Sequence, residues 1–277
     1  MRKKETIKSI LVHVILLITA ALFIFPFYWM LRTSVVGTGG IFSPDIHILP
    51  TELKLDNFSR ALTALPFGVY FLNTLIITVL NVIGVLLTSS LCAYGFSRIE
   101  WPGRDKVFGI MLTALMLPYS VLMIPHFIGW SFLGLTNTFV PLIVPAYLGG
   151  GLFNIFLLRQ FFLGIPKEMD EAAHMEGAGH LRIYWSIILP LSKQSLIVVG
   201  LLTYLTNWND YLAPMIYISS EKKFTLMLGL NQFMGGYNAQ WNLMMAAVVV
   251  IVIPSIVIYL FAQRYFVEGI AMTGIKG

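Results

Sequence analysis

The chain alternates between long apolar stretches and shorter polar ones. Six apolar stretches reach the roughly 20 residues that a helix needs to cross the hydrocarbon core of a bilayer. They cover residues 10–31, 70–94, 107–127, 139–162, 194–217 and 241–262. The pattern therefore predicts an all-α integral membrane protein with six transmembrane helices, which we treat as a single domain over residues 1–277.

Proline and glycine interrupt several of these predicted spans. Pro26 lies near the outer end of the first span, and Pro118 and Pro125 lie in the third. Prolines predict kinks, which are tolerated where neighbouring helices or water satisfy the freed carbonyls. Gly149, Gly150 and Gly151 fall near the middle of the fourth span and permit either very close helix packing or local unwinding.

The composition and the placement of charge agree with this topology. Hydrophobic residues make up 57% of the chain and charged residues only 11%, as in polytopic membrane proteins. The net charge is +5, and 13 of the 18 lysines and arginines fall on one side of the predicted topology. The positive-inside rule then predicts that both termini are cytoplasmic. The first apolar stretch is too long for a signal-peptide core and lacks a cleavage site, so we expect an uncleaved span.

The polar segment over residues 165–192 separates the fourth and fifth spans. Pro166 suits the first turn of a helix, and Glu168, Asp170 and Glu171 favour the positive end of the helix dipole. Gly177 and Gly179 can end this helix and turn the chain. A second helical segment follows over 180–188, with apolar side chains at helical spacing at Leu181, Tyr184, Trp185 and Ile188.

These features predict a short helical hairpin outside the lipid. A charged stretch between spans can also be an ordinary solvated loop. A DNA-binding helix-turn-helix is disfavoured by the apolar segments on both sides.

The hairpin carries the clearest resemblance to a known family. The order Glu-Ala-Ala, three residues, Gly, nine residues, Ile-x-Leu-Pro resembles the EAA loop of permease subunits in binding-protein-dependent ABC importers. The positions that match are Glu171, Ala172, Ala173, Gly177, Ile187, Leu189 and Pro190. The segments at 55–58 and 93–98 also resemble sugar permeases. The resemblance implies the fold of a type I ABC importer permease, with a cytoplasmic coupling helix that docks on an ATPase. Met175 belongs to the same expected ATPase-coupling set.

The resemblance also implies an assembly. We expect a second, homologous permease subunit, two cytoplasmic ABC ATPase subunits and an extracytoplasmic solute-binding protein, in a bacterial or archaeal cytoplasmic membrane. The expected substrate is a carbohydrate. Peptide, polyamine or phosphate remain alternative cargoes. The chain itself is expected to hold no cofactor, because it lacks a Walker A pattern; ATP and Mg would be bound by the partner ATPases.

Asp210 is the one carboxylate well inside a predicted span. An ionisable group at such a position is a candidate functional site. The surrounding segment offers amide, carboxylate and aromatic groups that suit a sugar, namely Asn207, Trp208, Asn209, Asp210 and Tyr211. The segment also resembles a step found in the family. We predict that part of this set lines the substrate path; the alternative is that Asp210 reaches water or caps residues 211–214.

The C-terminal tail is the second marker of the family. Residues 263–269 and 274–277 resemble the tail of sugar permeases of the maltose-system type, particularly the smaller partner, in which the tail can reach between the two ATPases. The expected ATPase-contacting residues are Gln263, Arg264, Gly274, Lys276 and Gly277. Residues 270–273 depart from the family pattern, and a disordered end is the alternative.

Other functional classes find little support in the sequence. The five histidines show no metal-ligand spacing, Cys92 is the only cysteine, and no nucleophile has a recognisable partner arrangement. We therefore expect a transporter subunit and neither an enzyme, a metal site nor a nucleic-acid-binding protein. An ion-coupled secondary transporter would need charged or unwound elements near the membrane midplane. Asp210 is predicted near the outer boundary instead.

Overall fold

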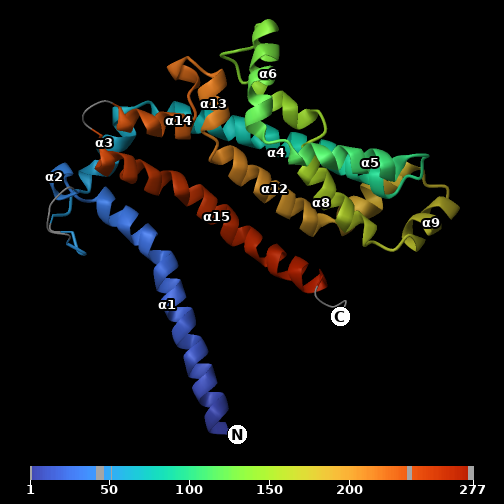
Figure 1. The fold of residues 1–277 in the computed structure, drawn as a ribbon, viewed down its shortest axis with the longest axis horizontal. Helices are drawn as coiled ribbons and strands as arrows, with labels where there is room; N and C mark the ends of the chain where they lie inside the picture. The colour runs from blue at the N-terminus through green and yellow to red at the C-terminus, as the bar shows by residue number, and fades with distance from the viewer. Residues whose placement is uncertain (1, 42–46, 51, 236–238, 274–277) are drawn as a thin grey trace. The chain divides into compact units, whose positions relative to one another are not determined.

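The computed structural model describes residues 2–41, 47–50, 52–235 and 239–273. Within these residues every regular element is a helix (Figure 1). The chain divides into two compact units, one formed by Met1–Phe67 with Gly229–Ile253 and the other by Gly68–Leu228 with Pro254–Gly277.

The helices of the first unit are α1 (Arg2–Ser34), α2 (Thr38–Ile41), α3 (Asp56–Ala64) and the 3₁₀ helix η5 (Gln232–Met234). The second unit begins with α4 (Phe67–Ser97), α5 (Arg104–Thr113), η1 (Ala114–Met116), α6 (Tyr119–Phe132), α7 (Val140–Ile143), η2 (Val144–Tyr147) and α8 (Leu152–Leu163). It continues with α9 (Glu168–Met175), α10 (His180–Ile183), the π-helix η3 (Tyr184–Ile188), α11 (Leu189–Leu191), α12 (Lys193–Trp208), α13 (Leu212–Tyr217) and η4 (Glu221–Lys223). Residues of α14 (Leu226–Asn231) and α15 (Trp241–Thr273) belong to both units, and the first residue of α4, Phe67, belongs to the first.

Four helical segments of the described chain are long and apolar enough to cross a membrane. They are Lys8–Ser34, Phe67–Ser97, Val140–Leu163 and Trp241–Arg264. Two strongly bent helix pairs raise the number to six if each pair forms one span: Arg104–Met116 with Tyr119–Phe132, bent by 96°, and His180–Leu191 with Lys193–Trp208, bent by 79°. The chain is thus a multi-pass helical membrane protein, and the exact count of six stays a prediction.

The predicted interruption of the third span at Pro118 is confirmed. Leu117 and Pro118 both have extended backbone, with ψ of 116° and 141°. The residue before a proline is driven out of the helical region by contact with the proline ring, which explains why the helix ends here. Pro125 lies inside α6, and Pro26 lies inside α1.

The three glycines of the fourth span combine the two effects predicted for them. Gly149, Gly150 and Gly151 have φ of +111°, +69° and +84°, so the chain is unwound between η2 and α8. A Cβ on Gly150 would lie 2.8 Å from the Thr88 hydroxyl and 2.8 Å from the Val85 carbonyl oxygen of α4. Unwinding and close packing against α4 therefore occur at the same point.

Two other sequence predictions need correction. The helix predicted over 194–217 is two helices, α12 and α13, separated at Asn209–Tyr211. Pro166 precedes the N-cap residue Lys167 of α9 and is not in its first turn.

The core of the second unit lies where α4, α8, α9, η3 and α12 meet. Its buried side chains include Leu158 and Phe162 from α8, Tyr184 and Ile188 from η3, and Val199 from α12. The π-helix explains a further difference from the sequence prediction. Tyr184 and Ile188 are buried, but Leu181 and Trp185 are exposed. Trp185 lies inside the π-helix, whose wider turn departs from the 3.6-residue period that the prediction assumed.

Asn57 forms hydrogen bonds to three segments of the first unit. Its fully buried amide donates to the carbonyl oxygens of Ser34 and Val36 at 2.9 and 3.1 Å, and its oxygen accepts a bond from Asn242 at 3.3 Å. Buried polar groups are stable only when paired in this way. The family-like segment at 55–58 thus joins α3 to the end of α1 and to α15.

The N-terminal part of α4 is fixed by polar side chains as well. The Asn73 amide donates to the carbonyl oxygens of Lys222 and Phe224, both at 3.0 Å. The Thr74 hydroxyl accepts a bond from the Leu226 backbone at 2.8 Å. The segment that follows α13 is therefore held against α4.

Candidate functional site

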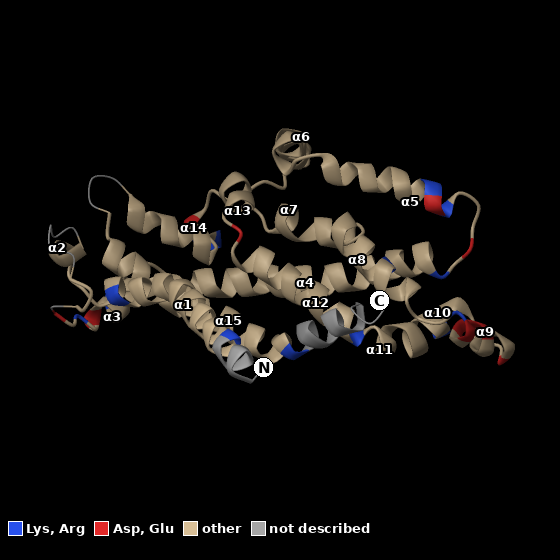
Figure 2. Cartoon of the chain, turned by 60° about the horizontal axis from the view of Figure 1, so that its bottom comes forward, with Lys and Arg blue, Asp and Glu red and all other residues tan. Residues whose placement is uncertain are grey.

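The hairpin predicted over 165–192 is present in the second unit. Its first arm is α9, and its second arm is formed by α10, η3 and α11. Three acidic residues lie in the first turn of α9, where they favour the positive end of the helix dipole. Figure 2 shows this acidic cluster on α9.

Gly177 ends the first arm with a Schellman motif. Its φ is +84°, its N–H donates to the His174 carbonyl at 2.9 Å, and the Ala178 N–H donates to the Ala173 carbonyl at 2.9 Å. This pair of bonds satisfies carbonyls that the helix end leaves free, and the left-handed position favours glycine. Gly179 has a different task, because it is the extended N-cap residue of α10.

The predicted coupling residues divide into an outward and an inward set. Glu171, Ala172, Met175, Gly177 and Pro190 are exposed. Ala173 is buried, and Ile187 and Leu189 pack against the core. Leu181 and Trp185 of the second arm are exposed as well, so both arms of the hairpin carry exposed apolar side chains. Met175 is 89% exposed, so its side chain contributes almost nothing to the packing of this chain.

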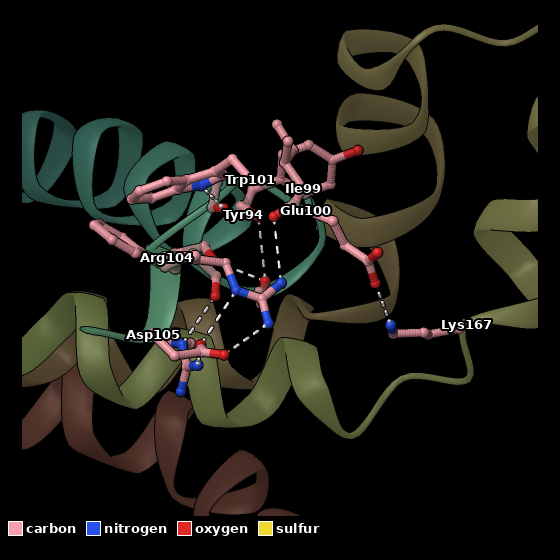
Figure 3. A network of polar contacts seen from close by, with 12 residues as sticks. Tyr94, Ile99, Glu100, Trp101, Arg104, Asp105 and Lys167 are labelled. Atoms are coloured by element: carbon pink, nitrogen blue, oxygen red, sulfur yellow. Dashed lines mark hydrogen bonds and ion pairs between the residues drawn. The ribbon is translucent and has the colours of Figure 1, made fainter. Parts of the chain in front are cut away.

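Ionic contacts hold the hairpin to the segment between α4 and α5 (Figure 3). Arg98 pairs with Asp170 at 3.6 Å and donates to the Ile165 carbonyl at 2.8 Å. At the surface, Lys167 donates to the Glu100 carboxylate at 2.9 Å. This hydrogen bond holds the pKa of the exposed Glu100 carboxyl below its usual value.

A related cluster fixes the end of α8. Arg159 donates to the Asp105 carboxylate at 2.8 Å and to the Phe96 carbonyl at 3.0 Å, and its guanidinium lies 4.3 Å from the centre of the Phe108 ring. Asp105 also pairs with Arg104 at 3.2 Å. The contacts of Arg159 could not be predicted from the sequence, because Asp105 and Phe96 lie more than 50 residues away in the chain.

The second candidate site is the break between α12 and α13. The Asp210 carboxylate accepts a hydrogen bond from the Ala213 N–H at 3.2 Å and so caps α13. Asp210 and Asn207 also line a cavity of about 190 Å³. Asp210 therefore caps α13, as one alternative predicted, and also lines a cavity. Its place on a substrate path stays a prediction.

The other members of the predicted substrate set lie elsewhere. Trp208 is almost completely buried, stacks on Tyr204 at 5.3 Å and meets the edge of Phe71 at 5.7 Å. The Asn209 amide is exposed and donates to the Leu205 carbonyl of its own helix. Tyr211 is partly buried and is not among the residues that line the cavity.

Residues that sequence reasoning missed complete the cavity wall. Tyr119, His126 and Trp130 come from α6, Thr74 comes from the N-terminal part of α4, and Thr225 comes from the segment before α14. The buried Thr225 hydroxyl makes no hydrogen bond within the described residues. The sequence held no signal for this grouping, because the fold alone brings α6 beside α13.

The predicted tail contacts are only partly described. Gln263 and Arg264 are exposed on α15, whereas Gly274, Lys276 and Gly277 lie outside the described residues. Within the described part of the chain, no three histidine, cysteine or acidic side chains come together as a metal site.

Comparison with known proteins agrees with this architecture. The chain is 32% identical to the arabinooligosaccharides transport system permease protein AraQ of Halalkalibacterium halodurans, covering 100% of this chain and 99% of that protein. It is also 32% identical to the sn-glycerol-3-phosphate transport system permease protein UgpE of Yersinia pestis, over 95% of each chain.

Among solved structures, a chain of a bacterial ABC transporter involved in the import of the acidic polysaccharide alginate superposes with a TM-score of 0.82. The sequence identity is 26%, and 95% of this chain and 98% of that chain are covered. Residues 85–272 match the family described as "Binding-protein-dependent transport system inner membrane component". The chain therefore belongs to this family of membrane transport components and is not an enzyme.

Proposed function

We propose that the chain is the permease subunit of an ATP-driven importer for a carbohydrate. In this proposal the two bent helix pairs each form one span, giving six spans with both termini in the cytoplasm of a bacterial or archaeal cell. A second permease, two ATPases and an extracytoplasmic solute-binding protein complete the assembly. The ATPases bind ATP and Mg, and this chain binds no cofactor.

One observation carries the coupling role. The hairpin leaves Met175, Leu181 and Trp185 exposed and carries three acidic residues in the first turn of α9, although other side chains of both arms are packed into the core. Large exposed apolar side chains accompanied by polar ones are typical of a protein–protein contact. We therefore assign the hairpin as the ATPase-docking element, with Gln263 and Arg264 and the residues after them as a second ATPase contact.

A carbohydrate cargo is favoured by the relatives and by the cavity at Asp210. AraQ and the alginate transporter are named for saccharides. The cavity combines aromatic rings with amide, hydroxyl and carboxylate groups, which suit the apolar faces and hydroxyls of a sugar. Its volume of about 190 Å³ is below the ~300–1,000 Å³ of typical ligand pockets. This subunit would thus contact a single sugar ring, and its partner would supply the remaining contacts.

UgpE supports a second candidate, a phosphorylated polyol. The cavity disfavours it, because its described lining residues include Asp210 and neither lysine nor arginine. A phosphate brought beside an unpaired carboxylate would be repelled. Neutral sugar therefore remains the better candidate.

Cross-linking tests the docking role directly. In a variant with Cys92→Ala, Met175→Cys should form a cross-link to the ATPase in the intact complex, because this side chain is exposed at the end of α9. Lys222→Cys is the matched control, since it is exposed on the predicted outer side. A cross-link from Lys222→Cys and none from Met175→Cys would contradict the proposal.

A further inference from the structure

The Arg98–Asp170 pair is unusual among the ion pairs of the described chain. Its side chains are only 2% and 14% exposed, whereas those of the neighbouring Lys167–Glu100 pair are 60% and 77% exposed. Arg98 follows the last turn of α4 and is tied to it by a backbone bond to the Tyr94 carbonyl at 2.9 Å. Asp170 lies in the first turn of α9. The pair thus joins the cytoplasmic end of α4 to the first arm of the hairpin.

Stability alone does not explain this pair. Arg98 Nε and Asp170 Oδ2 are 3.6 Å apart, beyond the roughly 2.7–3.2 Å of an N–H···O hydrogen bond. Arg98 Nε and Asp170 Oδ1 make no hydrogen bond within the described residues. A buried ion pair whose hydrogen-bonding groups are not all used adds little net stability to the fold. Separating the two residues is nevertheless costly, because it leaves an uncompensated buried charge. Its effect is therefore mainly to fix position.

The same end of α4 also holds the second arm. The Tyr184 hydroxyl of η3 lies 2.7 Å from the Ser90 hydroxyl, and the Tyr184 ring lies 5.4 Å from the ring of Tyr94. Both tyrosines are buried. The last two turns of α4 and the adjoining Arg98 therefore contact both arms of the hairpin.

The opposite end of α4 reaches the Asp210 cavity. Thr74 and Ile77 of α4 line this cavity, and Thr74 also bonds to the segment that carries Thr225. α4 is one uninterrupted helix of 31 residues without a proline, so a displacement of one end is transmitted along its axis.

We propose that Arg98 is a positioning residue for transport: through Asp170 and Ile165 it makes the cytoplasmic end of α4 follow the hairpin, and α4 carries that movement to the Asp210 cavity. The inference rests on the proposed function, since the hairpin must receive movement from an ATPase. In this proposal the buried Arg98–Asp170 pair links ATP hydrolysis, through the hairpin, to the Asp210 cavity. Arg98 itself touches neither the ATPase nor the substrate.

The test uses the complete transporter in proteoliposomes, with ATP hydrolysis and solute uptake measured together. Arg98→Gln and Asp170→Asn should retain the bound ATPase and its hydrolysis but lower the solute transported per ATP by about tenfold, within the usual range of coupling between sites. The double variant Arg98→Asp with Asp170→Arg should recover part of the loss. Glu100→Gln and Lys167→Gln are matched controls, because they break an exposed pair between the same two segments, and should transport normally.

The outcomes separate the two proposals. Normal transport per ATP in Arg98→Gln and Asp170→Asn would overturn the role of the pair and leave ATPase docking intact. An equal loss in the Glu100→Gln control would also overturn it, since any charge in the region would then suffice. If Arg98→Gln does not assemble, Asp170→Asn decides, because it is nearly isosteric and keeps the Arg98 bond to Ile165. Failure of the Met175→Cys variant, with Arg98 and Asp170 unchanged, to cross-link to an ATPase would instead refute the proposed function.

Discussion

Gly177 shows how one residue sets the geometry of the hairpin. Its φ of +84° places it in the left-handed region, and a Cβ there would meet no atom within 4 Å. A side chain at this position therefore costs backbone strain and no steric overlap. The glycine of the EAA pattern is explained by the turn it forms, before any contact with a partner is considered.

We predict that Gly177→Ala weakens the end of α9 by about 1 kcal/mol, the usual cost of a left-handed non-glycine residue. Local opening of residues 168–178 should rise roughly fivefold, which hydrogen–deuterium exchange of the assembled transporter would measure. Uptake should fall in parallel, while membrane insertion is retained.

Gly179→Ala is the matched control for this change. Gly179 also has open space at its Cβ position, but its φ is −77°, which any residue adopts. Exchange and uptake should therefore stay near those of the unaltered protein. Equal effects at both glycines would show that backbone conformation is not the cause.

At the level of elements, the turn between η2 and α8 permits a similar comparison. Gly149 and Gly150 both have positive φ, at +111° and +69°. Only Gly150 is pressed against α4, whereas a Cβ on Gly149 meets nothing within 4 Å. Replacing either glycine by alanine introduces backbone strain. The difference in stability between the two variants therefore measures the packing of this turn on α4.

We predict that Gly150→Ala destabilises the protein more than Gly149→Ala, by about 1–3 kcal/mol, the usual cost of overpacking. Thermal unfolding of the complex in lipid nanodiscs would measure the difference as a lower transition temperature. Similar temperatures for the two variants would mean that α4 moves aside at no cost, and so would contradict close packing of Gly150 against α4.

The sequence was most informative where a local pattern decides the structure. The hairpin, its glycine turn and the break at Pro118 follow from residues adjacent in the chain. The end of the hairpin at residue 192 was predicted, but the bend of 79° there was not, because Ser192 is neither glycine nor proline. The Arg98–Asp170 pair and the wall of the Asp210 cavity depend on tertiary packing between distant segments. Hydrophobic periodicity carries no information about such pairings.

At the scale of the whole molecule, the second unit separates the hairpin from the cavity along α4. The hairpin is attached to one end of α4, and the cavity is formed at its other end. Asp210 then has two separable properties, its hydrogen bond to the N-terminal turn of α13 and its negative charge beside the cavity. A pair of substitutions distinguishes them, because asparagine caps a helix about as well as aspartate and alanine does not.

We predict that Asp210→Asn leaves the thermal stability of the transporter nearly unchanged but reduces uptake of a neutral sugar roughly tenfold, because a charge-assisted hydrogen bond to a hydroxyl is lost. Asp210→Ala should show the same loss of uptake and an additional loss of about 1 kcal/mol in stability. Uptake at several sugar concentrations and thermal unfolding, measured on the same preparations, give both quantities. If Asp210→Asn transports normally while Asp210→Ala is unstable, the carboxylate serves only to cap α13, and the substrate must pass this subunit elsewhere.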